Sequence, residues 1–263
     1  MSAVTLEVER SDDAPGVVRL TLDNPPVNAT SIDDLRSIAD VLTSLSESDK
    51  VVVISARGKG FSAGGDLKEM DQLPGHEGIL QQCLESARAC TAISQCPIPV
   101  IVAIHDYCLG VGIEVVGSAD IAIANEEALF QWTEIDNGTI GGAAQGFRML
   151  PPQALRYLMF TAEPVTARDL WSRGALTEVV PASELINRTD DIAAVIASKQ
   201  PDLMRHLKSS MDALEAVDIE NAMRFEQGYI FQLNMEGTGS AARTAFLEGT
   251  RQGVKKDPLE PDA

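Results

Sequence analysis

Three short apolar runs constrain the fold of this chain more than any other feature. They occupy residues 51–55, 99–104 and 119–124, and each is almost continuously hydrophobic. Strands that are apolar on both faces are typical of parallel sheets covered by helices on each side. Helical patterns at about 78–95 and 110–117 separate the runs. The sequence therefore predicts an α/β core built on a mostly parallel sheet.

The N-terminal part predicts two further strands and a helix. Residues 4–8 and 17–22 alternate between apolar and polar side chains, and a polar turn at 11–16 joins them, so we expect an antiparallel pair. Residues 31–45 show helical periodicity, with Ser31 as the N-cap and with Leu35, Ile38 and Leu42 on one face.

Helices dominate the sequence after about residue 142. The clearest helical patterns are at 167–172, 183–199, 201–216, 219–235 and 240–251, with one short strand pattern at 177–180. A charged tail follows the last of them. No long linker or repeat interrupts this region, so it is predicted to be a helical extension of the α/β core.

Composition and charge exclude several classes of function. The chain has 263 residues and a formal net charge of −18, which argues against nucleic acid or an anionic membrane as the main partner. The four cysteines form no CxxC pair, and the three histidines are too widely spaced to predict a metal site. There is no N-terminal targeting pattern and no apolar run of about 18 residues. A cytoplasmic protein with reduced thiols and without a membrane partner is expected.

Three glycine-rich turns predict a site that binds an oxyanion. They lie at 61–68, 109–113 and 138–142. In the second turn a strand leads into a helix beginning near Gly110, so free N–H groups and the positive end of the helix dipole would converge there. A carbonyl oxygen bound at such a point is polarised. An enolate formed there is stabilised more than the neutral substrate from which it forms. The first turn is also explained by strand-to-helix geometry alone.

Two glutamates, Glu114 and Glu134, lie twenty positions apart, each beside one of these turns. Burial raises the pKa of a carboxyl group and suits it to general acid–base catalysis. One carboxylate would orient and deprotonate water while the other delivers a proton to carbon. Either residue alone is also explained as a surface or cap carboxylate, but the two together predict a reaction site.

Several segments resemble the enoyl-CoA hydratase/isomerase, or crotonase, superfamily. The similarity extends over about residues 4–250, and its most characteristic blocks are 24–29, 61–70, 97–112, 130–142 and 167–184. The resemblance implies a crotonase-like β-β-α spiral core over residues 1–195. It also implies a helical trimerisation region at 196–263, and assembly as a homotrimer or a dimer of trimers.

The resemblance also implies a role for individual residues. The N–H groups of Gly65 and Val111 would form the oxyanion hole, Glu114 and Glu134 would be the two acids, and Gly142 would help to hold the water. The residues expected to flank the substrate, chiefly through backbone contacts with its coenzyme A part, are Ala63, Asp66, Leu67 and Lys68. Coenzyme A would belong to the acyl-CoA substrate, and no cofactor or metal is expected.

The sequence departs from the family pattern around the acyl pocket, at His105-Asp106, Val111, Trp132-Thr133 and 141–147. Trp132 would either stack on a substrate ring or pack in the core. His105 would either have a catalytic role or, as we expect, be a turn histidine bonded to backbone. Asp136 would either join the site as a third carboxylate or, as we expect, cap a helix or turn. The acyl group is therefore left open.

Hydration of a 2-enoyl-CoA thioester by Glu114 and Glu134 is the function that the resemblance favours. The alternative is hydrolysis of a ring C–C bond in a cyclic β-oxo acyl-CoA, because residues 225–234 resemble the steroid-ring subgroup of crotonases. Glu114 favours hydration over this alternative. Double-bond isomerisation is a third possibility. A catalytically silent acyl-CoA-binding subunit is opposed by the two carboxylates, which binding alone does not require.

Overall fold

The computed structural model describes residues 6–74, 77–215, 235–236 and 248. Compactness divides the chain into two units, Met1–Ala193 and Ala194–Ala263. The helices predicted at 219–235 and 240–251 lie almost entirely outside the described residues. Both sheets and the pocket discussed below belong to the first unit.

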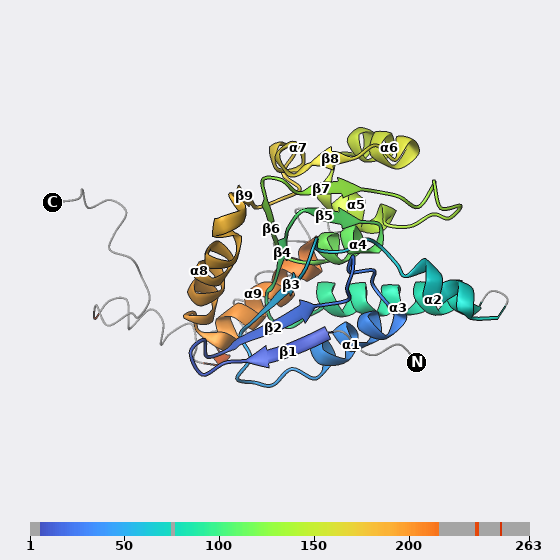
Figure 1. The fold of residues 1–263 in the computed structure, drawn as a ribbon. Helices are drawn as coiled ribbons and strands as arrows, with labels where there is room; N and C mark the ends of the chain where they lie inside the picture. The colour runs from blue at the N-terminus through green and yellow to red at the C-terminus, as the bar shows by residue number, and fades with distance from the viewer. Residues whose placement is uncertain (1–5, 75–76, 216–234, 237–247, 249–263) are drawn as a thin grey trace. The chain divides into compact units, whose positions relative to one another are not determined.

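The first sheet has six strands in the order β1-β2-β3-β4-β6-β9 (Figure 1). The strands are β1 (Leu6–Arg10), β2 (Val17–Leu22), β3 (Val51–Ala56), β4 (Val100–Ile104), β6 (Ile121–Asn125) and β9 (Glu178–Val180). β1 and β2 pair antiparallel and every other pair is parallel, which confirms both predictions. The side chains of Val52, Ile54 and Val102 are fully buried, as expected for strands covered on both faces.

Two long helices pack against each other beside this sheet, α1 (Ile32–Thr43) and α3 (Glu77–Ser94). Ser31 caps α1 as predicted, and it forms a capping box in which Asp34 N donates to Ser31 Oγ at 3.0 Å. The short helix α2 (Leu67–Gln72) connects the first glycine turn to α3. α1 anchors α3, and α3 forms one wall of the pocket.

A second, smaller sheet was not predicted. It joins β5 (Tyr107–Leu109), β7 (Leu129–Gln131) and β8 (Val165–Thr166). These strands have two or three residues, too few to show periodicity in the sequence. The helices that follow along the chain are α4 (Val111–Ser118), α5 (Ala143–Met149), α6 (Pro152–Thr161) and α7 (Ala167–Ser172). The parallel pairing of β5 with β7 brings the second glycine turn next to the segment that carries Glu134.

The chain continues through a short 3₁₀ helix at Ala182–Glu184 into α8 (Leu185–Ala197), which crosses the boundary between the two units, and then α9 (Pro201–Leu214). Gln200 caps α9, and Lys208 pairs with Asp212 at 2.8 Å along it. No helix in the described part of the chain combines the length and the apolar character needed to cross a bilayer.

Candidate active site

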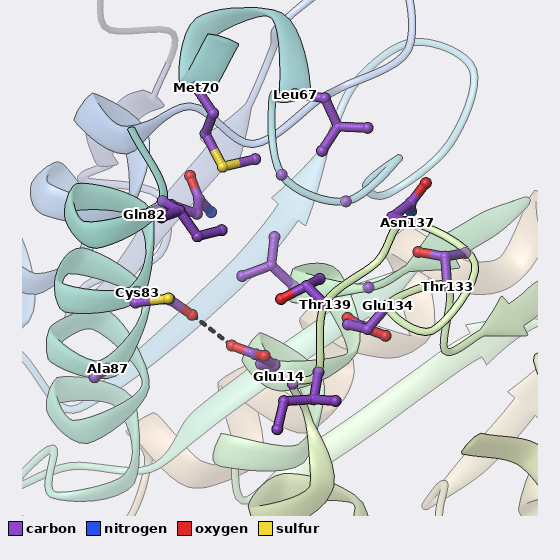
Figure 2. Close-up of a pocket in the computed structure, with 18 of the residues that line it drawn as sticks. Leu67, Met70, Gln82, Cys83, Ala87, Glu114, Thr133, Glu134, Asn137 and Thr139 are labelled. Atoms are coloured by element: carbon purple, nitrogen blue, oxygen red, sulfur yellow. Dashed lines mark hydrogen bonds between the residues drawn. The ribbon is translucent and has the colours of Figure 1, made fainter. Parts of the chain in front are cut away.

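Residues from all three glycine turns line one cavity of about 310 Å³. Its wall is completed by α2, by residues of α3 between Ile79 and Ala87 and by the start of α4 (Figure 2). Cavities that bind small ligands start at about this volume. Both predicted acids and both predicted oxyanion-hole residues line it.

The first glycine turn is held in place by the segment at 24–30. Thr30 N donates to Gly64 O at 2.8 Å, and Ala63 N donates to Asn28 O at 3.0 Å. Gly64 has a φ of 90°, a conformation that favours glycine. The N–H of the next residue, Gly65, donates to no protein group among the described residues, and Gly65 lines the cavity. It is therefore available to a ligand oxygen.

The second turn places a second free donor on the same cavity. Gly110 is the N-cap of α4 with a φ of 51°, and its own N–H donates to Gln131 O at 3.1 Å. Val111 is the first helical residue, so its N–H has no partner within the helix and lies at the positive end of the dipole. A Cβ on Gly110 would lie 3.2 Å from Glu134 Oε1, a tight contact, so the available space also favours glycine here.

The two glutamates converge on the cavity from different elements. Glu114 lies in the first turn of α4 and accepts a hydrogen bond from Ser86 Oγ on α3, drawn as a dashed line in Figure 2. Glu134 lies in the loop after β7. A Cβ placed on Gly141 would lie 3.0 Å from Glu114 Oε1 and 3.9 Å from Glu134 Oε1. Both carboxylates therefore reach the same point on the cavity wall.

The two glutamates differ in the surroundings of their carboxyl groups. Burial raises the pKa of Glu134 above its ordinary value, and the nearby charge of Glu114 raises it further. Glu134 Oε2 is buried without a hydrogen-bond partner in the described structure, whereas Glu114 is held by Ser86. A carboxyl group with a raised pKa beside a second, hydrogen-bonded carboxylate is suited to general acid–base catalysis.

Of the four residues predicted to flank the coenzyme A part of the substrate, two line the cavity and two do not. Ala63 and Leu67 line the cavity. Asp66 instead caps α2, accepting from Lys68 N at 3.0 Å and from Glu69 N at 3.1 Å. Neither Asp66 nor Lys68 is part of the cavity wall. A role for these two in binding coenzyme A stays a prediction.

Trp132 and Gly142 lie behind the cavity wall. The Trp132 side chain is 1% exposed and belongs to the hydrophobic core. It packs beneath Gly142, where an added Cβ would lie 3.2 Å from its ring. Of the two interpretations of Trp132, core packing agrees with this position, because Trp132 is not among the residues that line the cavity. Gly141, one residue before Gly142, lines the cavity instead.

Two further predictions concern residues near the turns. His105 Nε2 lies 3.2 Å from the carbonyl oxygen of Gly58, as expected for a turn histidine bonded to backbone. Asp136 is exposed and does not line the cavity. In the described part of the chain no cluster of three or more His, Cys, Asp or Glu side chains is placed to hold a metal ion.

The contribution of α3 to the cavity was not predicted from the sequence. Gln82 and Ser86 lie one turn apart on this helix, both are 7% exposed, and both line the cavity. The only signal was two polar residues at i and i+4 within a helix, a spacing that places them on one face. That spacing is common on solvent-facing helices as well, so it did not distinguish a site from a surface.

Comparison with known proteins places the chain among relatives of similar length. A model of the family described as Enoyl-CoA hydratase/isomerase matches residues 12–254. The (7aS)-7a-methyl-1,5-dioxo-2,3,5,6,7,7a-hexahydro-1H-indene-carboxyl-CoA hydrolase of Rhodococcus jostii is 36% identical over 92% of this chain and 94% of its own length. The protein of the same name from Mycobacterium tuberculosis is 34% identical over 89% of this chain and 96% of its own.

Solved structures agree on the fold. An enoyl-CoA hydratase of Mycobacterium smegmatis superposes with a TM-score of 0.86 at 28% identity, covering 94% of this chain and 97% of that one. Human enoyl Coenzyme A hydratase domain-containing protein 3 has a TM-score of 0.87 at 26% identity, covering 95% and 100%. These similarities confirm the predicted crotonase-like α/β fold. Together with the family match over residues 12–254, they show that this chain belongs to the enoyl-CoA hydratase/isomerase, or crotonase, superfamily of enzymes.

Proposed function

We propose that the protein hydrolyses a ring C–C bond of a cyclic β-oxo acyl-CoA. The observation that carries this proposal is the match, over about nine-tenths of the chain, to two relatives named as hydrolases of a dioxo ring compound esterified to coenzyme A. The proposal takes the alternative weighed from the sequence and places hydration second. The cavity supports it with two free N–H donors and two carboxylates.

The proposed reaction begins with the thioester oxygen bound between the N–H groups of Gly65 and Val111. Glu114 takes a proton from water, and the water oxygen adds to the carbonyl carbon of the ring ketone. The bond between that carbon and the α-carbon then breaks. Its electron pair passes into the thioester as an enolate, which the two N–H donors stabilise. Loss of one such donor typically costs about 2.7–4 kcal/mol of barrier.

Glu134 then protonates the α-carbon of the enolate. Its raised pKa favours holding the proton that this step needs. The proton that Glu114 took from water then passes to Glu134, which restores the starting protonation state of both groups. One water is consumed, the ketone carbon becomes a carboxylic acid, and the thioester to coenzyme A stays intact.

The first experiment uses 2-oxocyclohexane-carboxyl-CoA, a simple six-membered β-oxo thioester, in ¹⁸O-labelled water. Mass spectrometry is expected to show a product that has gained one water, carries the label in its new carboxyl group and retains coenzyme A. The Glu134→Gln variant serves as the matched inactive control. Released free coenzyme A, or an unchanged ring across bulkier bicyclic substrates as well, would contradict the proposal.

Hydration of a 2-enoyl-CoA is a second candidate, because Glu114 and Glu134 converge on one point at Gly141. Two carboxylates on either side of one water can add its elements across a double bond. Loss of the ultraviolet absorbance of crotonyl-CoA measures this reaction. Rapid loss with wild-type protein, together with an intact β-oxo ring in the first experiment, would establish hydration instead.

A further inference from the structure

Gln82 is a buried polar group of the cavity wall that the reaction described so far does not use. Its side chain is 7% exposed, it lines the cavity, and neither its Nε2 nor its Oε1 has a hydrogen-bond partner within the described residues. A buried amide without partners is costly to a folded protein. A ligand bound in the cavity would satisfy this group.

The position of Gln82 indicates which part of a ligand it would meet. A Cβ built on Gly65 would lie 3.1 Å from Gln82 Nε2 and 3.4 Å from Met70 Cε, so the amide lies directly beside the first oxyanion-hole residue. Figure 2 shows Gln82 on α3 next to Met70 of α2. A ligand whose thioester oxygen binds Gly65 would present its next few atoms to this amide.

Ser86 relates the position of Gln82 to that of Glu114. It lies one helical turn after Gln82 on the same face of α3, and it holds Glu114. Helix α3 therefore presents an amide beside the thioester site and, one turn of about 5.4 Å further on, the group that positions the proposed base. The oxygen of a carbonyl group between these two points would accept a hydrogen bond from Gln82. Water deprotonated by Glu114 would approach the carbon of the same group.

We propose that Gln82 binds the oxygen of a carbonyl group β to the thioester. This inference rests on the proposed function and names the group that the acyl part must carry. When water adds to that carbonyl its oxygen becomes an alkoxide, and the Gln82 N–H donor stabilises it as Gly65 and Val111 stabilise the enolate. A 2-enoyl thioester has no oxygen at this position and does not use Gln82.

Binding measurements test the inference without any turnover. Acetoacetyl-CoA and butyryl-CoA have the same chain length and differ in the β-oxygen. Calorimetric titration of the wild-type protein is expected to show tighter binding of acetoacetyl-CoA. In the Gln82→Met variant this preference should fall by about tenfold, the value of one hydrogen bond, while the affinity for butyryl-CoA is unchanged. In ring opening, the same variant should lose about 10²–10³ in kcat.

Gln81→Met is the matched control. Gln81 is the neighbouring residue on α3, and its Nε2 donates to Glu77 Oε1 at 2.8 Å outside the cavity. This variant should keep the wild-type ligand preference. The Tm of ligand-free Gln82→Met should be equal to or above that of the wild type, because an unsatisfied buried amide is removed. A structural role for Gln82 would instead lower the Tm and weaken both ligands equally.

The outcomes separate the two proposals. If the wild type opens no β-oxo ring but the preference for acetoacetyl-CoA depends on Gln82, the proposed function fails and the assignment of Gln82 stands. If Gln82→Met keeps the full preference for acetoacetyl-CoA, or loses affinity for both ligands alike, the assignment of Gln82 is overturned whatever reaction the wild type catalyses.

Discussion

Glu134 combines burial with a neighbouring negative charge, and both raise its pKa. The Glu134→Gln variant is expected to lose about 10²–10⁴ in kcat, the usual contribution of a general acid or base. Its KM should change less than its kcat, because the two N–H donors that bind the thioester are untouched. A variant that kept the wild-type kcat on both β-oxo and enoyl thioesters would contradict the role of Glu134.

The same substitution has a pH-dependent effect on stability. The folded-state pKa of Glu134 lies above its unfolded value, so its contribution to stability is present at low pH and is lost as pH rises through the folded pKa. Above that folded-state pKa, the wild type carries a partly buried anion that glutamine does not. Thermal denaturation should therefore show a Tm difference in favour of Glu134→Gln that grows as pH rises through the folded-state pKa and shrinks in acid. A difference independent of pH would contradict this account.

Ser86 is expected to act through Glu114. Its hydroxyl donates to Glu114 Oε2, and a hydrogen bond to a charged group is worth about 1.5–3 kcal/mol. Ser86→Ala should lower kcat by about tenfold or more and shift the pH–rate profile, while KM changes little. Ser37→Ala is the control, because its hydroxyl donates to the Asp33 carbonyl of its own helix at 2.7 Å. Equal kcat and equal pH profiles for the two variants would exclude a positioning role.

At the scale of the element, the start of α4 has a residue, Gly110, whose backbone conformation disfavours side chains and which lies against Glu134. Gly110→Ala should reduce the free energy of unfolding by about 1–3 kcal/mol, because a φ of 51° is unfavourable for alanine. Its Cβ would also press on Glu134 Oε1, so kcat should fall as well. Urea unfolding and steady-state kinetics measure the two effects.

Gly138→Ala is the matched variant for backbone strain. Gly138 has a φ of 72°, but an added Cβ would meet no atom within 4 Å. It should lose stability without a comparable loss of kcat. If both variants lost kcat equally, the contact between Gly110 and Glu134 would not explain the effect.

Helices and strands were predictable where a single segment shows a local sequence pattern. The Ser31 cap with the apolar face of α1, and the apolar runs that became β3, β4 and β6, are local patterns. β5, β7 and β8 have no such pattern, because strands of two or three residues are stabilised by their neighbours rather than by their own sequence.

At the scale of the whole molecule, we propose that residues 196–263 form an oligomerisation region. Leu207 and Met211 lie one turn apart on α9 and are 53% and 61% exposed, which leaves apolar surface for a partner. Light scattering after size-exclusion chromatography should give three or six times the chain mass of 28.2 kDa. A chain ending at residue 195 should lose this assembly. A monomeric full-length chain would contradict the proposal.

The predictable part of the site consists of groups close together in the sequence. Glu114 follows Gly110 and Val111 by a few residues, so one strand-to-helix turn accounts for a donor and an acid together. Glu134 was predicted from its own position beside the third glycine turn, and the family resemblance added the N–H donor of Gly65 from a separate segment. Secondary structure and adjacent chemistry follow from short-range sterics and side-chain periodicity, which the sequence displays directly.

The remaining features depend on packing between distant segments. The pairing of β5 with β7 places Glu134 against Gly110, and the packing of α3 brings Gln82 beside Gly65 and Ser86 to Glu114. Trp132, equally suited to a substrate ring or to the core, became part of the core. Distances between such residues are set by how whole elements fit together at close-packed density, and no local pattern encodes them.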